Sequence, residues 1–415
     1  MSKQYALEVP VIPELDPSLI VDVDLFGPEI KAHPEPLFAE WASKPPFYAM
    51  VNGRPNVVIC RHADVDKAFV DFDTFSVEPR PGWGGDPFDY FNSLPTVGDI
   101  DPPDHTRLRK LMQPAFTPKR VNELQAGVDA LTDQMLEEMA EKGTFDMMKE
   151  FAQPLSRRIL LGNFFQFREE DWHIFIDFSD AGKWVSTVPP GAPKPEPYMV
   201  AYNAGKQFCE DYIELRRNEP KDDIVGSIIA AHDVGGKITS LELFGALITL
   251  FVAGLGTIAG TLTLSIKRLL ENPDQLQLLR DDPTLVNQAV EECLRIDSIG
   301  NFRHRFVTKD TVLNGTPIYR GMIAQVSMGA SNYDPDFYSD PDKFDIMRKP
   351  RDISTFGYGA HFCIGHALAR AVVRTGIAKL VTRFPNLRLT DPHAEMAYAG
   401  LPTERMPVSL MLSVE

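Results

Sequence analysis

The feature that most restricts the fold is a long stretch without charge, which covers residues 243–266. Its length matches the roughly 20 apolar residues that cross a bilayer, but it contains four glycines and four threonines and lies mid-chain between polar segments. Thr239 and Glu242 have the spacing of a capping box before it, and Pro273 follows it. The pattern therefore predicts a long helix buried through the centre of a large domain.

The charge balance and the cysteine content exclude several classes of protein. The 42 Lys and Arg residues against 58 Asp and Glu residues give a net charge of −16, which argues against nucleic acid and anionic membrane as partners. The four cysteines are scattered without a CxxC pair, so neither a disulfide framework nor a zinc site is indicated. The N-terminal residues lack a basic region followed by an apolar core. We therefore expect no export signal and no membrane anchor, and a cytoplasmic protein.

Turn signals predict a small β region beside the helices. Asn52-Gly53 is flanked by alternating apolar residues, which indicates a hairpin over residues 46–60. Short β-like pieces also occur over residues 385–414, whereas residues 106–142 have helical apolar spacing. No composition shift divides the chain. We therefore expect one large, mainly α domain over residues 1–415.

The most informative motif is the glycine-rich loop Phe-Gly-Tyr-Gly-Ala-His-Phe-Cys-Ile-Gly at residues 356–365. Gly357 and Gly359 allow a tight turn, and an Ala-Leu-Ala-Arg run that reads as a helix start follows. A thiolate at Cys363 would face backbone N–H groups and a helix N-terminus, both of which stabilise negative charge. A lone thiolate on such a loop is how a protein holds haem iron for oxygen activation. The alternative is an incidental, buried free cysteine.

Two further motifs pair charged residues on helices. His105 and Arg109 are four residues apart after a double proline, so both project from one helix face and could grip an anionic group. On their own they equally fit an ordinary solvated helix. Glu292 and Arg295 are three residues apart and could form a one-turn ion pair that anchors a buried loop.

The uncharged helix carries a strip of small residues. Ala253, Gly256, Thr257 and Gly260 fall on one face, which a planar cofactor could approach closely. A groove for packing a neighbouring helix is the equally plausible alternative when this strip is taken alone.

Together, these motifs resemble those of the cytochrome P-450 family, the haem-thiolate monooxygenases, over nearly the full chain. The matching segments are residues 101–109, 253–257, 292–295, 332–348 and 356–365. The resemblance implies a mainly α fold with a small β region, in which haem b is buried between the long central helix and the cysteine loop. Without an N-terminal anchor, the chain is most similar to the soluble bacterial members.

The resemblance also implies a role for each matching residue. Cys363 would be the proximal thiolate ligand of the iron, and Phe356 would pack near it and limit water at the sulfur. Thr257 would hydrogen-bond the bound oxygen molecule and help to deliver protons. Glu292 and Arg295 would be a structural ion pair beneath the haem. The haem propionates would be bound by His105, Arg109, Arg305 and His361.

Gly256 departs from the family pattern. Most members carry Asp or Glu directly before the oxygen-handling threonine, and this carboxylate relays protons, a general-acid role that glycine cannot play. We expect either a water chain through the space that Gly256 leaves, or slow and poorly coupled catalysis. A different route, such as the use of peroxide, is the third possibility.

The expected reaction is insertion of one oxygen atom from O₂ into a small or medium apolar or aromatic, terpenoid-like substrate. An acidic ferredoxin-type protein would supply the electrons to a local basic patch. Its expected residues are Arg107, Arg109, Lys110, Lys119 and Arg120 around one helix, with Arg370 and Arg374 after the cysteine loop. The alternatives are peroxide-driven oxidation or rearrangement, and a non-catalytic haem ligand carrier or sensor. The expected substrate pocket is lined by Tyr90, Phe91, Leu250, Asn301, Phe302 and Leu401.

Overall fold

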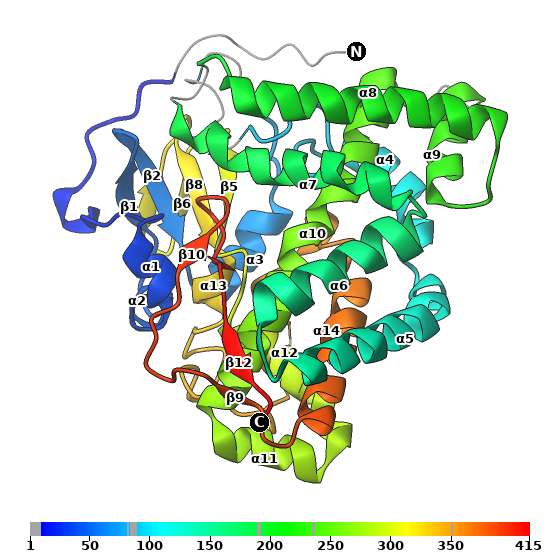
Figure 1. The fold of residues 1–415 in the computed structure, drawn as a ribbon. Helices are drawn as coiled ribbons and strands as arrows, with labels where there is room; N and C mark the ends of the chain where they lie inside the picture. The colour runs from blue at the N-terminus through cyan, green and yellow to red at the C-terminus, as the bar shows by residue number, and fades with distance from the viewer. Residues whose placement is uncertain (1–9, 81–82, 84–88, 189–191, 235–236, 350–351) are drawn as a thin grey trace.

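The uncharged segment forms helix α10, Ser240–Glu271, which runs through the middle of the molecule (Figure 1). Its first turn carries the capping box: Thr239 Oγ1 accepts a hydrogen bond from the Glu242 N–H at 3.2 Å, and the Glu242 carboxylate accepts one from the Thr239 N–H at 2.7 Å. Asn272 caps its C-terminal end before Pro273. Among the described residues it is the one helix long and apolar enough to span a membrane, yet 67% of its most apolar window is buried. The prediction of a central core helix is confirmed.

The computed structural model describes residues 10–80, 83, 89–188, 192–234, 237–349 and 352–415. Besides α10, the α-helices are α1 (Pro28–Ala32), α2 (Pro34–Ala42), α3 (His62–Val70), α4 (Asp104–Met112), α5 (Pro118–Lys142), α6 (Gln153–Arg157), α7 (Trp172–Ala181), α8 (Glu196–Asn218), α9 (Ile224–Asp233), α11 (Pro273–Asp281), α12 (Val286–Ile296), α13 (Met328–Ser331) and α14 (His366–Arg383). Shorter 3₁₀ segments are Pro17–Leu19, Gln113–Phe116, Glu169–Asp171, Gly182–Thr187, Pro283–Leu285, Ser354–Phe356 and Gly359–His361, and π-helical turns span Met147–Ala152 and Arg158–Phe164.

The largest sheet has five strands in the order β1-β2-β8-β5-β3. The predicted hairpin is confirmed: β1 (Phe47–Val51) pairs antiparallel with β2 (Arg54–Ile59) across Asn52-Gly53, where both residues have positive φ. Strand β2 runs parallel to β8 (Ile323–Ser327), which pairs with β5 (Phe302–Val307), and β3 (Phe75–Ser76) closes the edge. The smaller sheets are β4 (Thr144–Asp146) with β12 (Met411–Ser413) and β9 (Arg388–Leu389), β6 (Thr311–Leu313) with β7 (Thr316–Ile318), and β10 (Tyr398–Ala399) with β11 (Met406–Pro407).

Most of the long helices pack around α10. Helices α6, α7, α8, α12 and α14 all contact it, and α14 also packs along α5. The largest hydrophobic cluster is built from these helices, whereas the five-stranded sheet and helices α1 to α3 enclose separate clusters. The mainly α fold with a small β region is as predicted. Helix α14, which follows the cysteine loop, and strand β11 both contact α10, which sets the position of the site.

Candidate active site

The cysteine loop is held in shape by its backbone. Gly357 and Gly359 have φ values of 69° and 63°, a conformation that favours glycine. A Cβ atom on Gly357 would also lie 3.1 Å from the ring of Phe69 on α3. The Cys363 N–H donates to the Phe356 carbonyl at 2.9 Å, and α14 begins three residues after the cysteine. The loop therefore presents Cys363 at a helix N-terminus, as its sequence predicts.

Cys363 lies among positive charges. Burial raises the pKa of its thiol, while the Gly365 N–H and the guanidinium groups of Arg109, Arg303 and Arg370 oppose that rise. In the other three cysteines, burial drives the thiol pKa far above its usual range, and their side chains are buried in the core. Cys363 is thus the cysteine with three guanidinium groups opposing the effect of burial, and a bound metal cation would favour its thiolate.

Phe356 and Arg370 cover one side of the loop. The Arg370 guanidinium lies 4.4 Å from the centroid of the Phe356 ring and forms an ion pair with Glu291 of α12. The His366 ring stands edge-on to Phe356, with the two centroids 6.2 Å apart. Phe356 therefore packs beside the first turn of α14, which is compatible with the predicted role of shielding the cysteine from water.

His105 and His361 form an unusual buried pair. Their ring centroids are 4.2 Å apart, and His105 is only 2% exposed. Both ring nitrogens of His105 and Nε2 of His361 are buried without a hydrogen-bond partner among the described residues. Burial, together with nearby arginines, lowers the pKa of His105 to about 4 and that of His361 to about 2. Without an anion nearby, these surroundings favour the neutral form of both rings.

Arg305 and Arg109 complete this cluster. Arg305 is 4% exposed, its guanidinium lies 4.7 Å from the centroid of the Phe69 ring, and its side chain donates to the His304 carbonyl at 2.8 Å. Burial lowers its pKa to about 10 and also lowers the pKa of Arg109. Neither guanidinium forms an ion pair within the described part of the chain.

Such an arrangement is costly without an anion. Buried cations and unsatisfied donors each cost free energy, which charge-assisted hydrogen bonds to carboxylates recover. The cluster converges from α4, β5 and the cysteine loop, and it therefore fits the two propionate groups of a haem. The residues present thus match the cofactor that the sequence predicts.

The strip on α10 is open only in part. Ala253 is exposed and Thr257 is half-buried although both lie in the middle of a buried helix, so they border open space inside the molecule. Thr257 Oγ1 donates to the Ala253 carbonyl at 3.0 Å, and its lone pairs remain free to accept a further hydrogen bond. This exposure is compatible with Thr257 facing a bound cofactor.

Gly256 and Gly260 are covered by Met406 of β11. A Cβ atom on Gly256 would lie 3.2 Å from Met406 Cε, and one on Gly260 would lie 2.6 Å from Met406 Sδ. The Met406 side chain therefore narrows the space beside Gly256 through which the expected water chain would run. Of the expected four-residue strip, Gly260 is buried, whereas Gly256 and Thr257 are half-buried and Ala253 is exposed. The sequence offers no local signal for a contact across this many residues.

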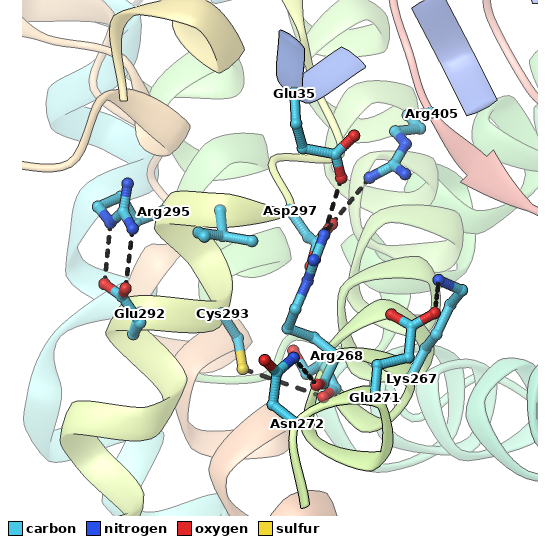
Figure 2. A network of polar contacts seen from close by, with 12 residues as sticks. Glu35, Lys267, Arg268, Glu271, Asn272, Glu292, Cys293, Arg295, Asp297 and Arg405 are labelled. Carbon is cyan, nitrogen blue, oxygen red and sulfur yellow. Dashed lines mark hydrogen bonds and ion pairs between the residues drawn. The ribbon is translucent and has the colours of Figure 1, made fainter. Parts of the chain in front are cut away.

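Figure 2 shows the ion pair of Glu292 and Arg295, whose side chains are both fully buried. Arg295 donates to both carboxylate oxygens of Glu292 at 2.8 Å, and to the carbonyls of Asn332, Pro341 and Lys343. The pair therefore ties α12 to the turn-rich segment over residues 332–348. Its location agrees with the structural role that the sequence suggests.

A second buried network was not predicted. Asp297, just after α12, accepts hydrogen bonds from Arg268 of α10 at 2.8 Å and from Arg405 at 2.8 Å, and Glu35 of α2 also pairs with Arg268 (Figure 2). Burial opposes ionisation of Asp297, but the two guanidinium groups outweigh it and lower its pKa to about 2. The network links α10 to the chain that leads into β11.

Four of the predicted pocket residues have locations compatible with a pocket wall. Tyr90 and Phe91 are half-buried against the main hydrophobic cluster; the Tyr198 hydroxyl of α8 donates to the Tyr90 carbonyl at 2.9 Å, and the Phe91 ring stacks on Phe178 of α7. Leu250 lies two turns before Thr257 on the same face of α10. Leu401 lies between β10 and β11, and its side chain borders the 3₁₀ segment at Gly182. Part of the neighbouring aromatic loop, residues 84–88, lies outside the described residues.

The other two pocket predictions, Asn301 and Phe302, are wrong. Phe302 is 1% exposed, and its ring packs edge-on against Phe26 and Phe38, with centroids 5.8 and 6.3 Å away. Asn301 is also buried, with its side-chain oxygen against Gly329 of α13. Both side chains belong to the packing between β5 and the N-terminal helices. Strand alternation gives the reason for Phe302: three residues before Arg305, it faces the opposite side of the sheet.

The comparisons with known proteins agree with this site. The chain matches the family described as cytochrome P-450 over residues 31–405, and it belongs to that family. It is 33% identical over 402 residues to the vitamin D(3) 25-hydroxylase of Pseudonocardia autotrophica, which covers 93% of this chain and 96% of that protein. It is 34% identical to the 6-deoxyerythronolide B hydroxylase of Saccharopolyspora erythraea, covering 74% and 76%. The solved structure of the polyketide synthase cytochrome P-450 PksS from Bacillus subtilis 168 covers 95% of this chain and 100% of that one, with a TM-score of 0.84 and 28% identity.

Family membership favours an enzyme over a non-catalytic haem protein. The chain is a haem b monooxygenase of the bacterial cytochrome P-450 type, as its relatives are hydroxylases. The prediction of an oxidoreductase is confirmed, and an enzyme is favoured over a ligand carrier or sensor. The relatives act on chemically different molecules, so membership does not define the substrate.

Proposed function

We propose that this protein inserts one oxygen atom into a small or medium apolar or aromatic substrate, with haem held by Cys363 and the buried His105–His361–arginine cluster. The observation that carries the proposal is that His105 Nδ1, His105 Nε2 and His361 Nε2 are buried without a hydrogen-bond partner among the described residues, near the buried Arg305. The haem, when bound, supplies the activation of O₂. We also propose that the protein is cytoplasmic, because its cysteines are all free thiols.

The chain's own residues would bind and orient the haem, contact the oxygen site and keep water out of the pocket. Arg109, Arg305 and the two imidazoles would hold the propionates by charge-assisted hydrogen bonds. Thr257 would offer the lone pairs of its hydroxyl as acceptors at the oxygen site, because its own proton is donated to the Ala253 carbonyl. Tyr90, Phe91, Leu250 and Leu401 would exclude water from the apolar side of the site.

The substrate class is tested by titrating the ferric, haem-loaded protein with terpenoids, neutral aromatics and aromatic acids while the Soret band is recorded. We expect a shift from low to high spin with the terpenoid or neutral aromatic class, because the remaining pocket wall is mostly apolar. A shift with the aromatic acids alone would instead indicate an ion pair between the substrate carboxylate and a cationic side chain. Arg303, which lies on the same face of β5 as Arg305, is the candidate. A protein that binds no haem would contradict the proposed function.

The electron donor would be an acidic ferredoxin-type protein that docks where α5 and α14 meet. Arg374 and Gln125 are hydrogen-bonded across these helices, and a shallow hollow there is lined by Pro118, Val121, Asn122, His366, Ala367, Arg370, Ala371 and Arg374. Positive charge on this face of an acidic chain would steer an acidic partner.

Reversing the charge at this face should slow the first electron transfer. With Arg374→Glu we expect the second-order rate of reduction by a plant-type ferredoxin to fall by about tenfold at low salt, and the difference to shrink as salt screens it. Stopped-flow reduction measures this rate. Lys206→Glu, an exposed reversal on α8, is the matched control and should change the rate little. Equal effects of the two variants would contradict a docking face at α5 and α14.

Peroxide-driven oxidation is the second candidate, because Gly256 lacks the carboxylate that usually relays protons. Product formed with hydrogen peroxide but not with reduced ferredoxin would favour it.

A further inference from the structure

Met406 is wedged into a notch in the central helix. The notch is formed by Gly256 and Gly260, one turn apart on α10, and the Met406 thioether lies against both. At Gly260 any side chain would collide with Met406 Sδ and with Ile299 Cδ1, at 2.6 and 2.9 Å from the Cβ position. Thr257 is the next residue after Gly256 and is half-buried. The thioether therefore covers the helix face directly beside the predicted oxygen-handling hydroxyl.

The wedge is anchored by the residue before it. Arg405 is 3% exposed and donates to Asp297 at 2.8 Å and to the Lys31 carbonyl at 2.6 Å, and its backbone N–H donates to the Ile299 carbonyl at 2.8 Å. Asp297 also binds Arg268 of α10, as Figure 2 shows. The strand that carries Met406 is thus fixed to α10 at two levels, by an ion network and by the thioether.

The hairpin that contains Met406 also contains Leu401, which is part of the expected pocket wall. Met406 pairs with Ala399 across the β10–β11 hairpin, and Leu401 lies in the turn between these strands. The hydrogen bond from the Asn301 N–H to the Thr403 carbonyl, at 2.9 Å, holds this turn against the start of β5. A displacement of Met406 would therefore move the wall as well as uncover the notch.

We infer that Met406 is a positioning residue of the oxygen site: it takes the space where other family members place a carboxylate, and it keeps water from reaching Thr257 along that face of α10. This inference rests on the proposed function. Its chemical consequence concerns the fate of the oxygen molecule. Productive turnover consumes O₂, two electrons, two protons and a substrate C–H bond, and it yields one hydroxylated product and one water molecule. When water delivers protons to the reduced oxygen before the substrate is oxidised, the same O₂, two electrons and two protons are released as hydrogen peroxide instead.

The test compares Met406→Ala, which opens the notch, with Met406→Leu, which refills it without sulfur. In the haem-loaded enzyme with a plant-type ferredoxin, its reductase and NADPH, we expect Met406→Ala to raise the hydrogen peroxide released per NADPH several-fold and to change its solvent deuterium isotope effect. Met406→Leu should restore both values toward those of the wild type. Met411→Ala, an exposed methionine on β12 of the same C-terminal segment, is the matched control.

A second measurement does not depend on turnover. In Gly256→Ala the new Cβ would press on Met406 Cε, so this variant should lower the melting temperature, and the loss should be smaller when Met406→Ala is present as well. Additive melting shifts, together with a peroxide yield in Met406→Ala no higher than in Met411→Ala, would overturn the inference. Failure of the proposed function is recognised separately, because all variants would then lack the spectrum of a thiolate-bound haem.

Discussion

Replacing Cys363 with serine is expected to abolish oxygenation while haem binding is retained. The propionate cluster of His105, His361 and Arg305 is untouched by this change, so the cofactor would still have its buried donors. A serine hydroxyl does not ionise in a site where even the cysteine thiol has its pKa raised by burial. It would therefore fail to supply the electron density that a thiolate pushes toward the oxygen.

The spectrum of the ferrous carbon monoxide complex measures this effect. The wild type should give the red-shifted Soret band of a thiolate-bound haem, and Cys363→Ser should lose that band together with all substrate oxygenation. Cys293→Ala is the control, because Cys293 is 1% exposed in α12 and lies against the Ser265 carbonyl of α10. Persistence of the thiolate band in Cys363→Ser, or its loss in Cys293→Ala, would contradict the assignment of Cys363.

The elements that could be predicted from the sequence are those whose signals are local. The capping box of Thr239 and Glu242, the turn at Asn52-Gly53 and the pair of Glu292 with Arg295 each involve residues at most three positions apart. Short-range hydrogen bonding and glycine geometry determine these features, so they depend little on the tertiary packing. The role of His105 required the resemblance to a family, because two charged residues on one helix face are common.

The elements that could not be predicted depend on contacts between distant segments. Met406 is 150 positions from Gly256, and nothing in either segment indicates that a thioether fills the notch. The Asp297 network joins four segments in the same way, which carry Glu35, Arg268, Asp297 and Arg405. Phe302 was predictable in principle, because the strand period of two places it on the side opposite to Arg305. That prediction was wrong because it placed Phe302 in a loop after the Glu292–Arg295 pair, whereas Phe302 is the first residue of β5.

The buried pair of Glu292 and Arg295 carries the largest expected effect on stability. Both side chains have no exposed surface, and Glu292 also accepts hydrogen bonds from the Asp345 N–H and from Arg348. Glu292→Gln keeps the shape of the side chain but leaves the Arg295 guanidinium buried without a counter-charge. Breaking one partner of a buried pair costs about 3–5 kcal/mol, and we expect the free energy of unfolding to fall by that amount.

The matched control is a pair with the same spacing on the surface. Arg120 and Glu123 are three residues apart at 2.9 Å, with half of each side chain exposed. Glu123→Gln should cost no more than about 1 kcal/mol, because solvent already screens that pair. Urea titration of the haem-loaded protein, followed by circular dichroism, compares the two variants.

Arg295 also binds three carbonyls of the 332–348 segment. Glu292→Gln should therefore loosen that segment first, and faster proteolysis there would separate this effect from a general loss of stability. Equal losses of unfolding free energy in Glu292→Gln and Glu123→Gln would mean that burial does not increase the contribution of the Glu292–Arg295 pair to stability.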